Sequence, residues 1–300
     1  PVCYGTDMSG YGHNPQGSQR IQCRNCKKVW TPKQYQKEIT HPQAIETVQL
    51  FIPFQGASAV QKLYVLVSLD ATRGNILHLS TNYTQHQTGD SLRYSYKGNT
   101  EPTMHHRDIV QKVDMREAQF LRRSQFDEIQ YGSAVLKRNG KGAILRPVIT
   151  AHGHFRILKI RYPDVKTHII AHECFLRGAI ITAWADQFRQ QQGELWFVEE
   201  EISDSNADTP WHFKGTTYHG WWQNQWQRWE QGNNCKMVCL LTGACLERGA
   251  NVSLATSRCF ITWLTDQHDF TQSALLSAGR VTQMLTSLAL KYNESLTPSC

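Results

Sequence analysis

The chain has 300 residues, and its 32 Lys and Arg outnumber its 25 Asp and Glu, for a net charge of +7. This length predicts one large domain, or one domain with a small module. The apolar content of 40% is enough for a core, but no run approaches the roughly 20 apolar residues of a membrane span. We therefore expect no membrane partner, and the mild positive charge suits a polyanionic partner such as nucleic acid.

The chain has nine cysteines and no secretory signal pattern in its first residues, which begin Pro1-Val2-Cys3. This combination favours a reducing compartment. In such a compartment cysteines are more often metal ligands or small core residues than disulfides. We expect a cytoplasmic protein, associated with the nucleoid if it binds DNA.

Residues 1–44 form a small basic module with a Cys-x-x-Cys pair, Cys23 and Cys26, flanked by cations and followed by Trp30. Such a pair is typical of one half of a structural zinc site, which takes four ligands. Cys3 is the candidate third ligand and His13 the candidate fourth. The alternative is a hairpin of the same shape that has lost its metal.

Three short apolar segments predict consecutive strands: residues 48–54, 62–69 and 76–82. The second and third enclose the turn signal Thr72-Arg73-Gly74-Asn75 and so predict a hairpin. Asp70 ends the second segment and would present its carboxylate at the rim of a sheet. Pro53 predicts that the first strand is at an edge or ends there.

Residues 83–150 are expected to be an insertion rich in cations. Asp114 and Glu117 fit a capping box, which predicts a helix from Asp114 to about Gln130 that ends near Gly132. The cations are either a solvated face or a surface that contacts phosphates. With the basic module they make up our candidate DNA-binding residues: Arg20, Arg24, Lys27, Lys28, Arg122, Arg123, Lys137, Arg138 and Lys141.

After the insertion the pattern returns to alternating helices and strands. We expect helices at 152–162 and 175–191, and strands at 166–171 and 195–198. The last strand runs into the acidic residues Glu199-Glu200-Glu201.

Residues 203–234 hold five of the nine tryptophans. Trp222, Trp226 and Trp229 are spaced i, i+4, i+7, which predicts one face of a helix. We favour a subdomain core or a helix that packs on the main domain. The functional alternative is a platform on which unpaired bases or a flipped base stack.

Residues 235–292 are expected to be helical. Cys235 and Cys239 would share a face of the first helix, where thiols are usually core residues. A last helix from about Thr271 to Tyr292 has apolar residues at helical spacing and would face the core or a second copy in a homo-oligomer.

Two segments resemble a known family. QRIQCRNCKKVW, residues 19–30, resembles the zinc ribbon that opens small insertion-sequence transposases, with the usual form Q-R-Y-x-C-x-x-C-x-K-x-W/F. LERGANVSLATSR, residues 246–258, resembles the helix after the last strand of their domain, where a catalytic Glu precedes Arg, Asn, Leu and Arg. The expected element order from 48 to 201 is also similar to that of a ribonuclease H-like fold.

The resemblance implies an α/β protein with a ribonuclease H-like mixed sheet flanked by helices, over residues 45–292 with insertions at 83–150 and 203–234. It implies three carboxylates that hold two divalent ions, Mg²⁺ or Mn²⁺, for phosphodiester chemistry. The candidate catalytic residues are Asp70, Glu173 and Glu247, with Glu46 before the first strand as a further candidate. The sequence departs from the pattern, because residues 48–54 contain no acid and His172-Glu173 stands where the family has an Asp.

Each candidate carboxylate also has a structural interpretation. Asp70 could cap a turn, Glu173 could cap its helix, and Glu247 could pair with an Arg. We therefore expect a transposase-like DNA-binding protein with an altered or degenerate catalytic centre. The alternatives are an active metal-dependent transposase that cuts and joins DNA, and a protein-interaction subunit of a larger DNA-associated complex.

Overall fold

The structure is a computed structural model, in which residues 7–13, 19–30, 41–56, 60–84, 108–130, 143–204, 209–243 and 246–296 are described. The chain divides into two compact units, Pro1–His41 and Pro42–Cys300. None of the helices within these ranges is long and apolar enough to cross a membrane.

The first unit contains a three-stranded antiparallel sheet in the order β1-β2-β3. Its strands are β1 (Met8–His13), β2 (Gln19–Cys23) and β3 (Val29–Trp30). β2 ends at Cys23, and the turn that follows is closed by a 3.0 Å hydrogen bond from the Cys23 amide to the Lys28 carbonyl. Lys27 adopts the left-handed conformation, with φ of 56°. The Cys-x-x-Cys pair therefore spans a tight turn between two strands.

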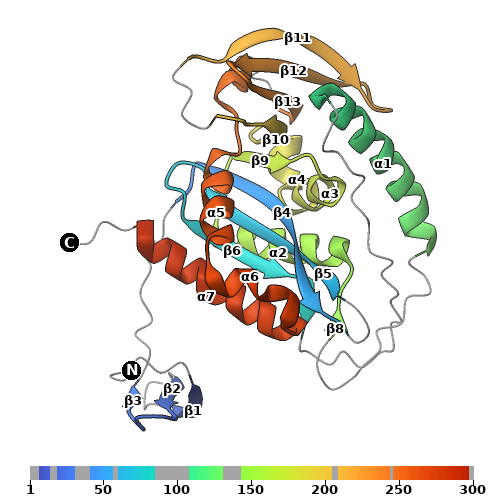
Figure 1. The fold of residues 1–300 in the computed structure, drawn as a ribbon. Helices are drawn as coiled ribbons and strands as arrows, with labels where there is room; N and C mark the ends of the chain where they lie inside the picture. Colours follow the sequence, from blue (N-terminus) through green and yellow to red (C-terminus); the bar gives the residue numbers. More distant parts are fainter. Residues whose placement is uncertain are drawn as a thin grey trace. The chain divides into compact units, whose positions relative to one another are not determined.

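The second unit is an α/β fold built on an eight-stranded mixed sheet in the order β11-β12-β13-β10-β9-β4-β5-β6 (Figure 1). β4, β9 and β10 are mutually parallel, and every other neighbouring pair is antiparallel. The short strands β7 (Tyr83–Thr84) and β8 (Ala143–Ile144) pair separately. The strands of the large sheet are β4 (Ala44–Gln55), β5 (Val60–Asp70), β6 (Ile76–Thr81), β9 (Thr167–Ala171), β10 (Glu194–Glu201), β11 (His212–His219), β12 (Asn224–Gln231) and β13 (Asn234–Thr242).

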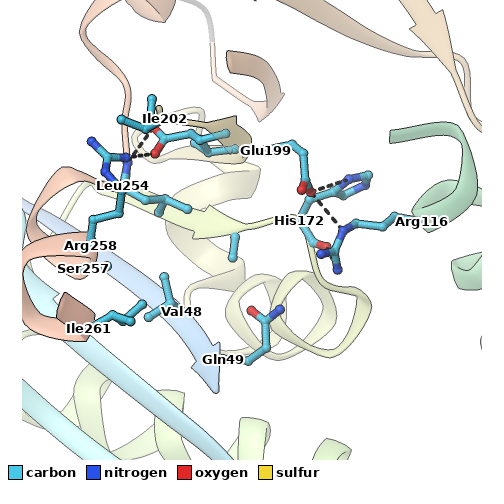
Figure 2. A pocket seen from close by; sticks show the side chains of 13 residues that line it. Val48, Gln49, Arg116, His172, Glu199, Ile202, Leu254, Ser257, Arg258 and Ile261 are labelled. Carbon is cyan, nitrogen blue, oxygen red and sulfur yellow. Dashed lines mark hydrogen bonds and ion pairs between the residues drawn. The ribbon is translucent and has the colours of Figure 1, made fainter. Parts of the chain in front are cut away.

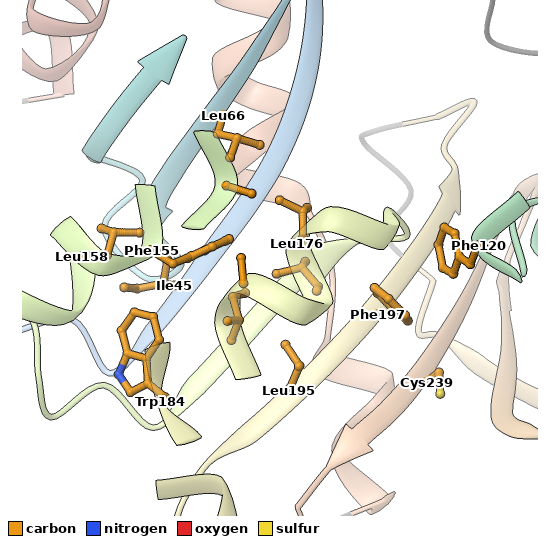
Figure 3. Close-up of a cluster of buried hydrophobic side chains, with 14 of the residues drawn as sticks. Ile45, Leu66, Phe120, Phe155, Leu158, Leu176, Trp184, Leu195, Phe197 and Cys239 are labelled. Atoms are coloured by element: carbon orange, nitrogen blue, oxygen red, sulfur yellow. The ribbon is translucent and has the colours of Figure 1, made fainter. Parts of the chain in front are cut away.

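Helices cover both faces of this sheet (Figure 1). On one face, α2 and α3 bury Phe155, Leu158 and Leu176 against apolar residues of β4, β5, β9 and β10 (Figure 3). On the other face, α5 and α7 bury Phe260, Val281 and Leu285 against β4, β5 and β6. The helices are α1 (Ile109–Gln130), α2 (Pro147–Arg161), α3 (Cys174–Ala183), α4 (Ala185–Arg189), α5 (Ala255–Thr265), α6 (His268–Thr271) and α7 (Ala278–Leu296), with the 3₁₀ helices η2 (Leu246–Asn251) and η3 (Ser273–Leu275).

The predicted hairpin is present as β5 and β6. Alternate residues of β5 enter the two cores: Leu63, Val65, Val67 and Leu69 on one face and Tyr64 and Leu66 on the other. Both faces are buried, which explains why this strand is apolar over nearly its whole length. The turn is fixed by Asp70, whose side chain accepts hydrogen bonds from the amides of Thr72 and Arg73.

The first strand is longer than the segment 48–54, because it begins at Ala44 and continues to Gln55. Glu46 therefore lies inside the strand rather than before it. Pro53 neither ends β4 nor lies in an edge strand. It is accommodated because β9 pairs with β4 only as far as Thr47, so the lost amide at Pro53 removes no bond to β9.

The described residues 209–234 of the tryptophan-rich segment form strands and a turn, so the helix predicted from Trp222, Trp226 and Trp229 is wrong. Trp226 and Trp229 lie on β12, and Trp222 lies in the turn before it. Residues an odd number of positions apart point to opposite faces of a strand. Accordingly Trp226 packs in the core beneath α1 and α3, while Trp229 contacts Phe213 and the cluster on the opposite face.

The helix predicted to begin at Cys235 is likewise wrong, because residues 234–242 form β13 between β10 and β12. Cys235 and Cys239 still share a face, since a spacing of four brings residues together on a strand as well as on a helix.

The other predicted helices exist with shifted ends. α1 begins at Ile109, before the capping-box residues, and the predicted stop at Gly132 lies outside the described residues. The helix predicted at 175–191 is interrupted at Trp184 and forms α3 and α4. The last helix begins at Ala278 rather than Thr271.

Candidate functional site: a cavity at the ends of the parallel strands

A cavity of about 350 Å³ lies where the parallel strands β9 and β10 end beside the middle of β4. From β4 the chain first builds the sheet in one direction through β5 and β6, and later in the other through β9 and β10. The boundary between β4 and β9 is thus a topological switch point, the position where open α/β sheets form ligand crevices beyond the carboxyl ends of their strands. The lining residues are Val48, Gln49, Arg116, Ala171, His172, Val198, Glu199, Glu200, Ile202, Leu254, Ser257, Arg258 and Ile261 (Figure 2).

Glu199 of β10 is the centre of one polar group in the wall. Its Oε2 lies 2.9 Å from Nε of Arg116 on α1 and 3.8 Å from Nδ1 of His172 (Figure 2). Arg116 also lies 3.4 Å from the carbonyl oxygen of His172. Burial raises the pKa of Glu199, and the Arg116 guanidinium opposes that rise. The arginine therefore neutralises a carboxylate that is largely withdrawn from water.

Glu200 is the centre of a second polar group, on the other face of β10. It forms an ion pair with Arg258 of α5 and accepts a 3.0 Å hydrogen bond from the Leu254 amide. Burial raises the pKa of Glu200, and Arg258 is the largest opposing influence. Both glutamates of the cavity are thus matched by one arginine each.

His172 is fully buried at the end of β9. Its Nε2 lies 3.3 Å from Oε1 of Glu117, which also accepts a hydrogen bond from Asn224. Burial lowers the pKa of His172 to about 4, so the imidazole is neutral at pH 7. The Nδ1 atom has no hydrogen-bond partner among the described residues.

Gln49 of β4 faces His172 across the strand boundary, two residues beyond the pair Thr47 and Ile170. Its side chain points into the cavity (Figure 2). Its Oε1 is buried and, within the described chain, accepts no hydrogen bond. The floor of the cavity is therefore polar but uncharged.

Glu46 lies near the start of β4 and binds the first residues of α5. Its carboxylate accepts hydrogen bonds from the amide and hydroxyl of Ser257, both at 2.9 Å, and from the amide of Thr256. Burial raises the pKa of Glu46. This carboxylate caps a helix and does not line the cavity.

The predicted carboxylates Asp70 and Glu173 are not brought together. Asp70 is level with Ile45 and His168 in the sheet, so Glu173 lies five residues further along, about 16 Å at 3.3 Å per residue. Glu173 caps α3 by accepting from the amides of Phe175 and Leu176, and it accepts a 3.2 Å bond from the Tyr64 hydroxyl. Glu247 lies in η2, and its side chain is outside the described part of the structure.

No cluster of three His, Cys, Asp or Glu side chains that could hold a metal ion occurs among the residues that the structure describes. The chemistry of the cavity agrees with this. A hard divalent cation takes several oxygen ligands, mostly anionic, whereas both glutamates here are held by arginines. Gln49 on β4 and His172 after β9 carry no charge at pH 7.

Of the predicted zinc ligands, Cys23 and Cys26 lie close together and His13 does not. Cys23 is buried at the end of β2, and Cys26 is exposed in the turn. His13 pairs with Gln19, four residues from Cys23 along β2, which is about 13 Å. That separation is too long for two side chains bound to one zinc at 2.0–2.3 Å each. Cys3 lies outside the described residues.

Of the predicted DNA-binding residues, four are visible on the first unit. Lys27 and Lys28 are exposed, Arg24 lies 3.7 Å from Asp7, and Arg20 lies over the ring of Tyr11 at 5.7 Å. The remaining candidates lie outside the described part of the structure: the side chains of Arg122 and Arg123, and residues Lys137, Arg138 and Lys141.

Sequence reasoning missed the residues that line the cavity: Arg116, His172, Glu199, Glu200 and Arg258. One signal was available, because Glu199-Glu200-Glu201 directly follows the apolar residues of a strand. Acidic residues at the carboxyl end of a central parallel strand are expected at the edge where ligand sites form.

The chain matches no family model, no curated protein and no solved structure. The residues of the cavity and of the two units are therefore the basis for a functional proposal.

Proposed function

We propose that this protein is a transposase-like DNA-binding protein whose catalytic centre is altered, with a ribonuclease H-like second unit. The strand arrangement supports this. β4, β5 and β6 form an antiparallel meander, and β9 and β10 follow in parallel beside β4, so the five strands have the order 3-2-1-4-5. Three consecutive strands followed by two strands that alternate with helices agree with the element order from 48 to 201 on which the resemblance rests. β11–β13 extend the sheet as an insertion after the fifth strand.

The composition of the cavity is the observation that carries the proposal. In the resembled family, acids on the first strand and at the end of the fourth hold the metal ions. Here Glu46 on β4 and Glu173 after β9 are engaged by the amides at the starts of α5 and α3. The residues of these two elements that line the cavity are Gln49 and His172. With Glu199 and Glu200 neutralised by arginines, the described residues of the cavity lack the charge needed for two divalent ions.

The first unit would supply the other phosphate contacts. Arg20, Arg24, Lys27 and Lys28 surround the turn that carries Cys23 and Cys26. We propose that this turn holds a structural zinc ion together with ligands outside the described residues. A rigid turn with four cations would then bind DNA mainly through counterion release, and binding would weaken steeply with salt.

The test is a gel-shift and cleavage assay on labelled duplex DNA, in EDTA, Mg²⁺ or Mn²⁺ and over a series of salt concentrations. The proposal expects a salt-sensitive shift and no cleavage in any condition. Replacing Lys27 and Lys28 by Gln should weaken the shift and reduce its salt dependence. If no DNA is shifted at any protein concentration at low salt, the DNA-binding proposal is wrong.

The same assay separates the alternatives. Cleavage that requires a metal and is lost in Glu247→Gln or Glu199→Gln would establish an active transposase instead. If the chain has no affinity for DNA, the remaining hypothesis is a protein-interaction subunit, because the exposed aromatic side chains would then need a protein partner.

A further inference from the structure

Aromatic side chains are exposed where β11 turns into β12. Tyr218 ends the exposed part of β11, and Trp221 and Trp222 occupy the turn that follows; we refer to these three rings as the aromatic platform. Their exposed fractions are 60%, 76% and 52%. Tryptophan is seldom left this accessible, and three such rings within five residues indicate a binding surface.

The platform carries a cation. The guanidinium of Arg177 on α3 lies 4.8 Å from the ring centre of Trp222. Lys214, on the same strand as Tyr218, is half exposed and lies 3.3 Å from Glu230. Among the described residues Arg177 forms no ion pair with a carboxylate, so its charge is available beside the rings.

Buried contacts hold the platform in place. Trp226 on β12 is fully buried and stacks on Phe197. His219, one residue after Tyr218, is held by Asp114 at 2.6 Å and by Thr217 at 2.8 Å. The exposed rings therefore project from a strand end that is anchored on both sides, not from a loose loop.

The platform also adjoins the cavity. Gly220 in the turn packs directly on Glu117, and Asn224 at the end of the turn donates to the same carboxylate. Glu117 in turn contacts His172, which lines the cavity. One side chain thus separates the aromatic turn from the wall that contains Arg116.

We propose that the aromatic platform stacks the unpaired bases of single-stranded DNA, with Arg177 beside the phosphates. This inference rests on the proposed function and specifies the kind of DNA that the second unit takes. Proteins commonly bind single strands with aromatic rings on which the bases stack and with cations that contact the phosphates, because every base has a flat face and the backbone carries phosphates. A duplex keeps those faces inside and cannot use the rings. An apolar protein partner would not use the Arg177 guanidinium.

The experiment compares three labelled ligands by fluorescence anisotropy with the full chain: oligo(dT), an abasic strand of the same length, and a duplex. Oligo(dT) and the abasic strand carry the same phosphate charge and differ only in bases. We expect the wild-type chain to bind oligo(dT) at least about fivefold more tightly than the abasic strand, the minimum for one stacked base. Tryptophan fluorescence should be quenched by oligo(dT) and not by the abasic strand.

In the double variant Trp221→Ala/Trp222→Ala the preference for oligo(dT) should disappear, while affinity for the abasic strand and the duplex stays unchanged. Trp221→Phe should retain the preference, and Leu290→Ala, at an exposed position of α7, is the matched surface control. Unchanged preference in the double variant would overturn the inference, as would equal affinity of the wild-type chain for oligo(dT) and the abasic strand. If the chain binds duplex DNA but does not prefer oligo(dT) to the abasic strand, the stacking inference is wrong and the proposed DNA binding stands. If the chain binds oligo(dT) but not the duplex, the proposed duplex binding by the first unit is wrong and the stacking inference stands.

Discussion

Gly220 lies so close to Glu117 that a Cβ added at position 220 would be 2.2 Å from the Oε2 atom of Glu117. Gly220 also has φ of +76°, a conformation that residues with a Cβ rarely adopt. Both features fix the turn between β11 and β12 against α1. Through Glu117 the same contact reaches His172 and the cavity.

Replacing Gly220 by Ala should therefore be costly. The added methyl group must displace Glu117 and hold a strained φ, and we expect the free energy of unfolding to fall by about 1–3 kcal/mol. Denaturant unfolding followed by circular dichroism measures this. Gly153→Ala is the matched control, because Gly153 lies in α2 with no atom within 4 Å of the added Cβ, and there Ala should stabilise by up to about 1 kcal/mol. Equal stability of Gly220→Ala and the wild type would contradict the close approach.

The ion pair of Arg116 and Glu199 gives a second prediction. Arg116→Met would leave Glu199 buried without its guanidinium, and we expect a loss of about 2–4 kcal/mol at pH 7. Since burial already raises the pKa of Glu199 above its usual 4.5, the folded state binds this proton more tightly than the unfolded state does. The cost therefore appears as pH rises above 4.5 and disappears below it.

Thermal or denaturant unfolding of Arg116→Met between pH 4 and pH 7 tests this sign. The double variant Arg116→Met/Glu199→Met should be more stable than the single variant at pH 7, because it leaves no uncompensated charge. If Arg116→Met loses the same free energy of unfolding at pH 4 and at pH 7, Arg116 does not stabilise the Glu199 carboxylate.

How far the sequence predicts this fold depends on how local each signal is. The hairpin of β5 and β6 is predicted correctly, since its alternation and turn lie within about twenty residues. The errors fall at Trp222, Trp226 and Cys235, where a spacing of four satisfies a helix and a strand equally. The pairing of β13 with β10 and β12 decides between them, and it depends on segments distant in the sequence.

The cavity was harder to predict for the same reason. Gln49, Arg116, His172 and Glu199 come from β4, α1, the end of β9 and β10, and only the strand register brings them together. The sequence suggested Asp70 and Glu173 because each stands at the end of an apolar strand. Yet antiparallel β5 ends at the opposite edge from parallel β9, and the alternation pattern does not reveal strand direction.

Lys236 of β13 gives a prediction in the alkaline range. Its side chain is fully buried, its Nζ donates to the carbonyls of Ala250 at 2.6 Å and Val252 at 2.7 Å, and it lies 4.5 Å from the ring centre of Trp211. Lys236→Met would leave both carbonyls without this donor, and we expect a loss of about 2–4 kcal/mol.

The pH dependence of Lys236 has a definite sign. Burial lowers its pKa from 10.5 to about 8, so between these values the unfolded state holds a proton that the folded state has released. Stability of the wild type should then rise relative to Lys236→Met by about 1.4 kcal/mol for each pH unit in that window. Parallel stability profiles of the two proteins from pH 7 to pH 10.5 would contradict the lowered pKa.

The proposed zinc ion leads to a prediction that separates the candidate ligands. Protein purified without chelator should contain zinc by elemental analysis, and Cys23→Ser or Cys26→Ser should remove it, because a structural site needs its thiolates. His13→Ala should keep the zinc, since the register of β1 and β2 holds His13 opposite Gln19 and away from Cys23. Loss of zinc in His13→Ala would show that the first unit adopts another register, and zinc retained in Cys23→Ser/Cys26→Ser would exclude this turn as the metal site.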